Sequence, residues 1–200
     1  MKVKAVVFDL GKVLVDFDYG IAARKLAEKS AVAADEVRAL VDQSPLLFRY
    51  ERAGMTTQEF FAEVRQRIGY TGTFDEFAAA FADIFTEIPE MTRWHNDIRM
   101  RGLPTFILSN TNEIAITHVR KNFPFFAHFT DYVFSYEQGA LKPEPRIYEI
   151  TERHTGCREG ELLFIDDKPE NIATAAQRGW CTICHSSPPE TIQAARAWLS

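Results

Sequence analysis

The chain has 200 residues, 46% of them hydrophobic, and a net charge of -5 with a pI near 5.6. That length and apolar content suit one sizeable core, or a core with a smaller inserted domain. The acidic balance and the lack of a basic run argue against a nucleic-acid partner. Apolar stretches are too short to span a membrane, and Asp9 interrupts the first one before it resembles a signal peptide. We therefore expect a soluble, cytoplasmic protein.

The first predicted element along the chain is a strand that runs into an acid. Residues 6–16 read VVFDLGKVLVD, so a run of apolar residues ends at Asp9, and Gly11 follows closely. Such a run is typical of a buried parallel strand, and ligands bind outside the carboxyl ends of such strands. A carboxylate there can act as a covalent nucleophile or hold a cation, although aspartates also cap helices at that point.

Residues 17–87 show no strand pattern, and we expect helices throughout this block. Thr56-x-x-Glu59 and Thr73-x-x-Glu76 have the spacing of capping boxes, which open helices. The phenylalanines after the second box, up to Phe85, recur at helical spacing. That spacing indicates one apolar helix face, which we interpret as packing core.

From Met91 onward, helical and strand patterns alternate. We expect helices at 91–101, 112–123, 145–155 and 169–178, and strands at 104–108, 132–134, 162–165 and 181–184. This alternation predicts an α/β fold, a Rossmann-like parallel sheet with helices on both faces. The block 17–87 is then a small α-helical cap domain inserted into a core domain of residues 1–16 and 88–200, where it can cover the Asp9 loop.

Three cysteines bear on the compartment and on metal binding. Cys157, Cys181 and Cys184 cannot all pair within one chain, which is typical of a reducing compartment. Cys181 and Cys184 have a C-x-x-C spacing that zinc sites also use. Because they lie on a predicted strand, where alternate residues face opposite sides, we interpret them as buried hydrophobic residues instead.

Polar side chains follow three further predicted strands. Ser109 and Asn110 follow the strand at 104–108, Lys142 comes after the strand at 132–134, and Asp166-Asp167 closes the strand at 162–165. Each group alone could be a helix cap or a solvated loop. Parallel strands end at one edge of a sheet, however, so we expect these groups to lie together with Asp9.

The order, spacing and strand context of these groups resemble the haloacid dehalogenase-like (HAD) hydrolase superfamily. Its four motifs match at Phe8-Asp9-Leu10-Gly11, at Leu108-Ser109-Asn110, at Lys142-Pro143, and at Ile165-Asp166-Asp167 continuing to Asn171. The resemblance covers the whole chain. The form Asp-Leu-Gly-x-Val-Leu-Val-Asp and the small helical cap are most similar to sugar-phosphate phosphatases of the alpha-D-glucose-1-phosphatase kind.

The resemblance implies a phosphatase in which Asp9 is the nucleophile and forms an aspartyl-phosphate. Lys142 would neutralise phosphate charge, and Ser109 and Asn110 would donate hydrogen bonds to phosphoryl oxygens. In the cap, we expect Arg49 to contact the phosphate or hydroxyl groups of the substrate.

Magnesium is the implied cofactor, because a carboxylate attacks a phosphate dianion only if their repulsion is cancelled. Its expected ligands are the Asp9 carboxylate, the Gly11 main-chain carbonyl, and the carboxylates of Asp166 and Asp167. Adjacent carboxylates are costly without a cation, which also favours a metal here. We expect the substrate to be a small phosphomonoester such as a sugar phosphate, and the protein to be a monomer or a weak homodimer.

Gly11 departs from the pattern of the superfamily, whose phosphatases usually have a second aspartate two residues after the nucleophile. That aspartate protonates the leaving oxygen and later activates water, which typically contributes on the order of 10²–10⁴-fold. Three hypotheses remain: Asp16 or Asp18 substitutes for it, the substrate has a good leaving group and relies on water, or the activity is weak.

Two other functions stay open. In a haloacid dehalogenase, Asp9 would attack carbon and displace halide, which needs neither an acid at position 11 nor magnesium. That function leaves Asp166 and Asp167 unexplained, and such dehalogenases usually have an aromatic residue at position 11. A catalytically weak binding protein with the same fold would also lack one catalytic residue.

Overall fold

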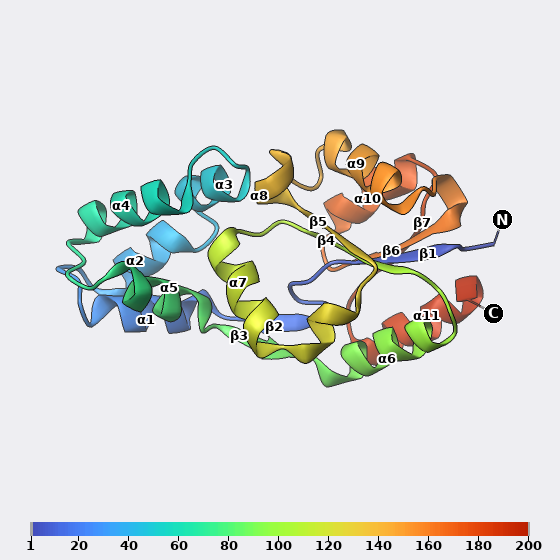
Figure 1. Ribbon diagram of the computed structural model, residues 1–200, viewed down its shortest axis with the longest axis horizontal. Coiled ribbons are helices and arrows are strands. Elements are labelled where there is room, and N and C mark those ends of the chain that lie inside the picture. The colour runs from blue at the N-terminus through green and yellow to red at the C-terminus, as the bar shows by residue number, and fades with distance from the viewer. Residues whose placement is uncertain (1, 200) are drawn as a thin grey trace.

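The computed structural model describes residues 2–199, and a five-stranded parallel sheet forms its centre (Figure 1). The strands lie in the order β5-β4-β1-β6-β7, and every neighbouring pair is parallel. Their bounds are β1 (Ala5–Phe8), β4 (Thr105–Ser109), β5 (Asp131–Phe134), β6 (Leu162–Asp166) and β7 (Cys181–Cys184). The predicted α/β class with a parallel sheet is confirmed.

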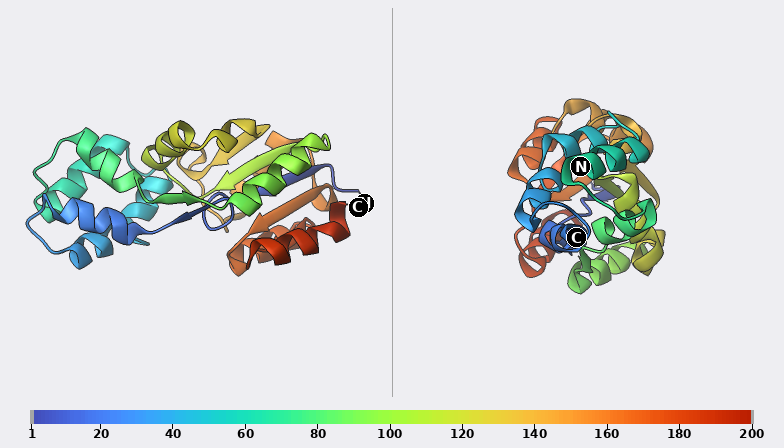
Figure 2. Two further views of the ribbon diagram at one scale, coloured as in Figure 1. Left: turned by 90° about the horizontal axis from the view of Figure 1, so that it is seen from below. Right: turned by 90° about the vertical axis from the view of Figure 1, so that its left-hand side faces the viewer.

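Helices cover both faces of this sheet (Figures 1 and 2). Because alternate strand residues point to opposite faces, Val6 and Phe8 pack into one apolar cluster while Ala5 and Val7 pack into another. On the Phe8 side the cluster includes residues of α6 (Pro89–Met100), α7 (Glu113–Asn122) and α11 (Pro188–Leu199). On the Val7 side it includes residues of α9 (Pro145–Thr155) and α10 (Pro169–Gln177).

Five helices between β1 and α6 form a separate bundle with its own buried cluster, to the left in Figure 1. They are α1 (Tyr19–Ala27), α2 (Ala34–Val41), α3 (Pro45–Glu51), α4 (Thr57–Ile68) and α5 (Phe74–Ala82). The two predicted capping boxes are present. The side chains of Thr56 and Thr73 each accept the backbone N–H of the third helical residue, and the glutamate side chain at that residue accepts the threonine N–H. Phe77 and Phe81 of the predicted stripe are fully buried in this bundle.

The prediction that residues 17–87 are entirely helical is wrong at both ends of the block. There β2 (Val15–Phe17) pairs antiparallel with β3 (Phe85–Glu87), which places Phe17 opposite Phe85. Helix α5 ends at Ala82, and Phe85, which the helical spacing had included, lies in the strand. Both strands are three residues long and far apart in sequence, so local periodicity does not reveal their pairing. This ribbon joins the helical bundle to the sheet.

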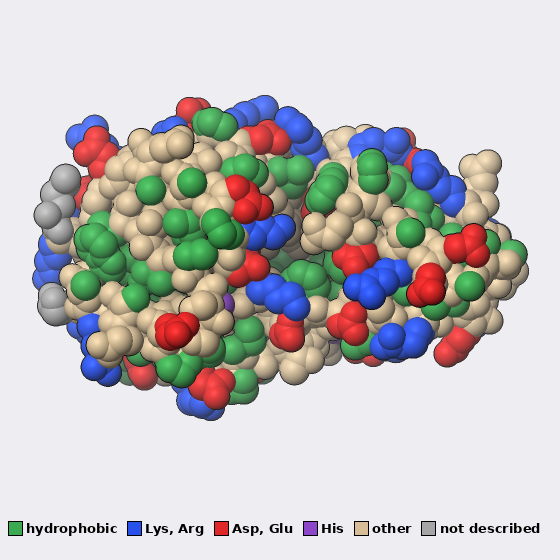
Figure 3. Space-filling view, turned by 180° about the vertical axis from the view of Figure 1, so that it is seen from behind, with side chains coloured by type: hydrophobic (Ala, Val, Ile, Leu, Met, Phe, Trp, Pro, Cys, Tyr) green, Lys and Arg blue, Asp and Glu red, His purple; other side chains and the backbone are tan. Residues whose placement is uncertain are grey.

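Shorter elements complete the chain. They are a helical turn, α8 (Ser135–Gln138), and two 3₁₀ helices, η1 (Pro124–His128) and η2 (Glu159–Glu161). The predicted strand at Cys181–Cys184 is confirmed as β7. Cys181 is buried as expected, but Cys184 is exposed, so its interpretation as a buried hydrophobic residue is wrong. The two thiols therefore diverge. Within residues 2–199, no helix has the length and apolar character needed to cross a bilayer. On the face shown in Figure 3, acidic and basic side chains are interspersed, and the surface is hollowed between the two lobes.

Candidate active site

The chemistry-bearing residues meet where the central strands end. Strand β1 lies between β4 and β6, so Asp9, Ser109 and Asp166 emerge side by side at the carboxyl edge of the sheet. Lys142 reaches the same place from the loop before α9. All four residues are buried, with exposed fractions of 8% or less. The structure therefore brings these predicted residues together.

Lys142 connects the two carboxylates. Its Nζ lies 2.9 Å from Asp9 Oδ1 and 2.6 Å from Asp166 Oδ2, and it donates a third hydrogen bond of 2.9 Å to the Leu108 carbonyl. Burial alone would lower the pKa of Lys142, but attraction to Asp166 and Asp9 outweighs it, so the net shift is upward. The lysine is thus a fixed positive charge at the strand ends.

Asp9 is held by its own backbone as well as by Lys142. The Leu10 N–H donates to Asp9 Oδ1 over 2.7 Å, the same oxygen that faces Lys142. Burial raises the pKa of Asp9 to about 7, Lys142 opposes that shift, and Asp166 and Asp167 add to it. Both donors contact Oδ1, so Oδ2 is the oxygen left for a ligand.

Asp166 is the most enclosed carboxylate of the site, with no exposed surface. Besides Lys142, it accepts the Lys168 backbone N–H over 2.8 Å and the Asn171 side-chain amide over 2.9 Å. Asn171 is itself fixed, because its main-chain carbonyl accepts a hydrogen bond from the Tyr148 hydroxyl. The start of α10 therefore orients Asp166.

The acidic cluster fits a divalent cation. One carboxylate oxygen each from Asp9, Asp166 and Asp167 lie within 4.8 Å of one another. Attraction to Lys142 and Lys168 acts on this cluster, and three carboxylates against two ammonium groups leave an excess of negative charge. An all-oxygen donor set suits Mg²⁺. Gly11 lies close by, lining the adjacent pocket, and its carbonyl as a fourth ligand stays a prediction.

Both polar atoms of the Asn110 side chain form hydrogen bonds with the main chain of Lys142. Its Nδ2 donates to the Lys142 carbonyl over 2.9 Å, and its Oδ1 accepts the Lys142 N–H over 2.7 Å. This clamp joins β4 to the Lys142 loop and leaves one Nδ2 hydrogen for a ligand. The prediction that Asn110 binds a phosphoryl oxygen stays a prediction, whereas Ser109 lines the pocket with its hydroxyl close only to its neighbour's carbonyl.

Arg49 lies away from these groups. It is exposed on α3 and forms an ion pair with Glu63 of α4, and it does not line the pocket beside Ser109. Substrate contact by Arg49 therefore finds no support in this arrangement. Two residues later on the same helix, Glu51 is buried and does line that pocket. The sequence analysis selected Arg49 in this helix and missed Glu51.

A small cavity of about 100 Å³ lies between the strand ends and the helical bundle. The core contributes Gly11, Ser109, Asn110, Asn112 and Lys168, and the bundle with its ribbon contributes Phe17, Leu47, Phe48, Glu51 and Phe85, among others. Asn112 caps α7 through its Oδ1, which accepts the Ala115 N–H over 3.0 Å. The cavity thus places bundle side chains opposite Ser109 and Asn110.

The space beside Gly11 is filled by an aromatic ring. A Cβ atom at position 11 would lie 2.8 Å from Cε1 of Phe17. The two carboxylates considered as replacements point elsewhere: Asp16 pairs with Lys12, and Asp18 caps α1 by accepting the Gly20 N–H. Neither lines the cavity.

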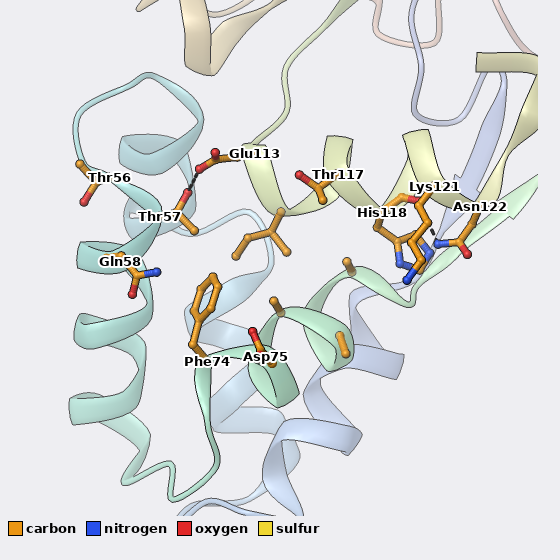
Figure 4. A pocket seen from close by; sticks show the side chains of 14 residues that line it. Thr56, Thr57, Gln58, Phe74, Asp75, Glu113, Thr117, His118, Lys121 and Asn122 are labelled. Atoms are coloured by element: carbon orange, nitrogen blue, oxygen red, sulfur yellow. Dashed lines mark hydrogen bonds between the residues drawn. The ribbon is translucent and has the colours of Figure 1, made fainter. Parts of the chain in front are cut away.

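A larger cleft, of about 600 Å³, lies between α4, α5 and α7 (Figure 4). Its walls carry alanines, Phe74 and Ile114, and Glu113 bridges it by a hydrogen bond from Thr57. None of the predicted catalytic or metal-binding residues lines it. Gly11, Ser109 and Asn110 line the smaller cavity instead.

Comparison with known proteins identifies the family of this chain. A sequence model of the haloacid dehalogenase-like hydrolase family matches residues 3–179. The D-ribitol-5-phosphate phosphatase of Bacteroides thetaiotaomicron is 24% identical over 187 residues, covering 90% of each chain. Acyl-CoA dehydrogenase family member 10 of Mus musculus is 26% identical over 210 residues, which span 98% of this chain but 19% of that protein.

A solved structure shows the same fold. A HAD family enzyme of Bacteroides thetaiotaomicron, crystallised with magnesium and inorganic phosphate, superposes with a TM-score of 0.82 at 24% identity. The match covers 92% of this chain and 94% of that one. The arrangement of sheet and helical bundle is therefore shared by both proteins.

Proposed function

Because the chain belongs to the haloacid dehalogenase-like hydrolase family, we propose that it is a magnesium-dependent phosphatase that hydrolyses a small phosphomonoester. The observation that carries this proposal is the buried contact of Lys142 with both Asp9 and Asp166, beside the three-carboxylate cluster. Similarity to a sugar-phosphate phosphatase over 90% of the chain supports a sugar or polyol phosphate as the substrate. Residues 17–87 act as the cap of this site.

Asp9 begins the proposed reaction. Its Oδ2 attacks phosphorus, the bond between phosphorus and the ester oxygen breaks, and the leaving oxygen takes a proton from water because Gly11 has no side chain to supply one. The resulting aspartyl-phosphate is then attacked at phosphorus by water. This second step releases inorganic phosphate and a proton and restores the Asp9 carboxylate.

Other residues hold the charges in place during both steps. Lys142 neutralises charge on the phosphoryl group and on Asp9, and the Ser109 hydroxyl donates to a phosphoryl oxygen. Asp9, Asp166, Asp167 and the Gly11 carbonyl would hold Mg²⁺, which would neutralise the charge between Asp9 and phosphate and orient the oxygens. Asn110 keeps Lys142 in position through its two backbone hydrogen bonds.

Hydrolysis of phenyl phosphate tests this function, because its good leaving group needs no acid at position 11. We expect turnover with Mg²⁺ that is lost with a chelator and that falls on the order of 10³-fold or more in Asp9→Asn. Asp97→Asn, an exposed aspartate on α6, is the matched control and should retain full activity. Folded wild-type protein that releases no phosphate under these conditions would refute the proposal.

A further inference from the structure

Two buried polar groups face the small cavity, and they lie near each other without an ordinary hydrogen bond between them. Glu51 of α3 is 8% exposed, and its carboxylate forms no ion pair with any residue in the range 2–199. Asn112 is 1% exposed, and while its Oδ1 caps α7, its Nδ2 has no hydrogen-bond partner within that range. A buried polar group without a partner is costly, so both groups are expected to meet a ligand.

The two groups come from opposite sides of the cavity. Glu51 belongs to the helical bundle and Asn112 to the first turn of α7 in the core, and the Asn112 amide lies close enough to favour the charged form of Glu51. Gly11 and Ser109 line the same cavity. A leaving group that extends into this cavity from a phosphoryl group at Ser109 would therefore meet Glu51 and Asn112.

A carboxylate that accepts and an amide that donates are together the complement of a hydroxyl group. The hydroxyl hydrogen can be donated to Glu51 while its oxygen accepts from Asn112 Nδ2, which satisfies both buried groups at once. An anionic leaving group cannot donate in this way, and it meets the negative charge of Glu51 at short range. The pair thus combines attraction for a hydroxyl with rejection of a second acid.

We propose that Glu51 and Asn112 form a subsite that recognises a hydroxyl on the leaving group and selects polyol or sugar phosphates without a second acidic group. This inference rests on the proposed phosphatase function and extends it to the identity of the leaving group. Glu51 and Asn112 determine specificity here and take no part in bond breaking.

The electrostatics around Glu51 agree with this geometry. Burial raises the pKa of Glu51 to about 7, the ammonium of Lys168 and the Asn112 amide oppose the shift, and Asp9 adds to it. Lys168 lines the cavity from the core side, but it forms no ion pair with Glu51 in the described part of the chain. The protein alone leaves this carboxylate poorly solvated, and hydroxyl donors from a substrate would correct that.

Four substrates separate the possible roles of the subsite. Phenyl phosphate and ethyl phosphate carry no hydroxyl on the leaving group, glycerol phosphate carries two, and phosphoglycolate carries a carboxylate. The variants are Glu51→Ala, Glu51→Gln and Asn112→Ser, of which the last keeps a capping oxygen for α7 but removes the Nδ2 amide and shortens the side chain. Glu36→Gln, an exposed glutamate on α2, is the control from the same bundle.

The expected result is a split between substrates. Glu51→Ala and Asn112→Ser should lower kcat/KM for glycerol phosphate about 10- to 100-fold, the range for hydrogen bonds to charged or buried groups, and change phenyl and ethyl phosphate less than about 3-fold. Glu51→Gln should raise kcat/KM for phosphoglycolate relative to glycerol phosphate, because it removes the repulsion while keeping the shape.

Other outcomes overturn the inference in distinguishable ways. Equal losses on glycerol phosphate and ethyl phosphate in Glu51→Gln, with phenyl phosphate spared, would make Glu51 a proton donor rather than a hydroxyl acceptor. Unchanged selectivity among the four substrates in all three variants would show that Glu51 and Asn112 form no hydroxyl subsite. If wild type hydrolyses none of the four esters, the phosphatase function itself fails, and the subsite falls with it.

Discussion

The site has two halves, the core half at the strand ends and the cap half formed by the helical bundle, and they differ in how buried charge is paired. In the core half, Lys142 contacts Asp9 at 2.9 Å and Asp166 at 2.6 Å, and hydrogen bonds to backbone and to Asn171 occupy Asp166 further. In the cap half, Glu51 is equally buried but has no ion-pair partner in the described chain. In the core half the buried charges are paired within the protein, whereas in the cap half a bound ligand would supply the partner of Glu51. This difference predicts that removing the charge of Lys142 destabilises the protein and that removing the charge of Glu51 stabilises it.

Lys142→Met should give the largest effect and test the core half. Removal of the ammonium leaves Asp9 and Asp166 buried without their partner, and breaking such a pair typically costs about 3–5 kcal/mol of the free energy of unfolding. Urea unfolding in the presence of a chelator measures this loss, and phosphatase activity should disappear with it.

The control for this prediction is Lys121→Met, an exposed lysine on α7, which should change stability by less than about 0.5 kcal/mol. A Lys142→Met protein as stable as wild type would show that the acidic cluster does not depend on the lysine. The core half would then be no better organised than the cap half, and the comparison would fail.

The core half could be predicted from sequence because topology fixes it. Asp9, Ser109 and Asp166 each end a buried strand, and parallel strands end at one edge, so their proximity follows from the alternation of strands and helices. Lys142 follows β5 less directly, because the helical turn α8 and a short loop lie between them, and its placement also drew on resemblance to a known motif. Even so, the sequence did not show that Asn110 clamps that loop.

The cap half could not be predicted in this way. Arg49 and Glu51 lie two residues apart on one short helix, and only the packing of α3 decides which of them faces the core. The ribbon that sets the position of the bundle pairs residues 15–17 with residues 85–87, a contact that no local pattern reveals. A buried carboxylate without a partner is visible only in three dimensions.

Glu51→Gln should stabilise the protein, the opposite sign to Lys142→Met. The pKa of Glu51 is raised from 4.5 to about 7, so ionisation costs stability as pH rises through this range, and the full cost is present above it. The neutral amide avoids that cost, so we expect a gain of at most about 3 kcal/mol at pH 8 and little gain at pH 5. Lys168 and Asp9 are the charged groups that face Glu51, and a chelator keeps their surroundings constant.

Thermal unfolding of Glu51→Gln and Glu36→Gln at the two pH values measures this gain. The exposed control should show no pH-dependent difference from wild type. Equal stability of Glu51→Gln and wild type at pH 8 would mean that the carboxylate is already satisfied in the free protein, and the need for a hydroxyl ligand would disappear.

The smallest predicted effect concerns Gly11, where the two halves meet. A Cβ at this position lies 2.8 Å from Cε1 of Phe17, whose ring also makes edge contacts with Tyr19 and Phe85. Gly11→Ala should therefore cost about 1–2 kcal/mol of the free energy of unfolding, because the ring must move within a packed group. In a Phe17→Leu background the same change should be neutral or slightly stabilising, because alanine restricts the unfolded chain.

The double-mutant cycle separates two explanations for the missing acid at position 11. Coupling of about 1 kcal/mol between Gly11→Ala and Phe17→Leu, measured by urea unfolding, would show that the ribbon ring excludes any side chain there. Additive effects would show that the space is available and that glycine serves the backbone alone. In the first case the absent aspartate is a consequence of how the cap is attached, since Phe17 belongs to the ribbon that joins the bundle to the sheet.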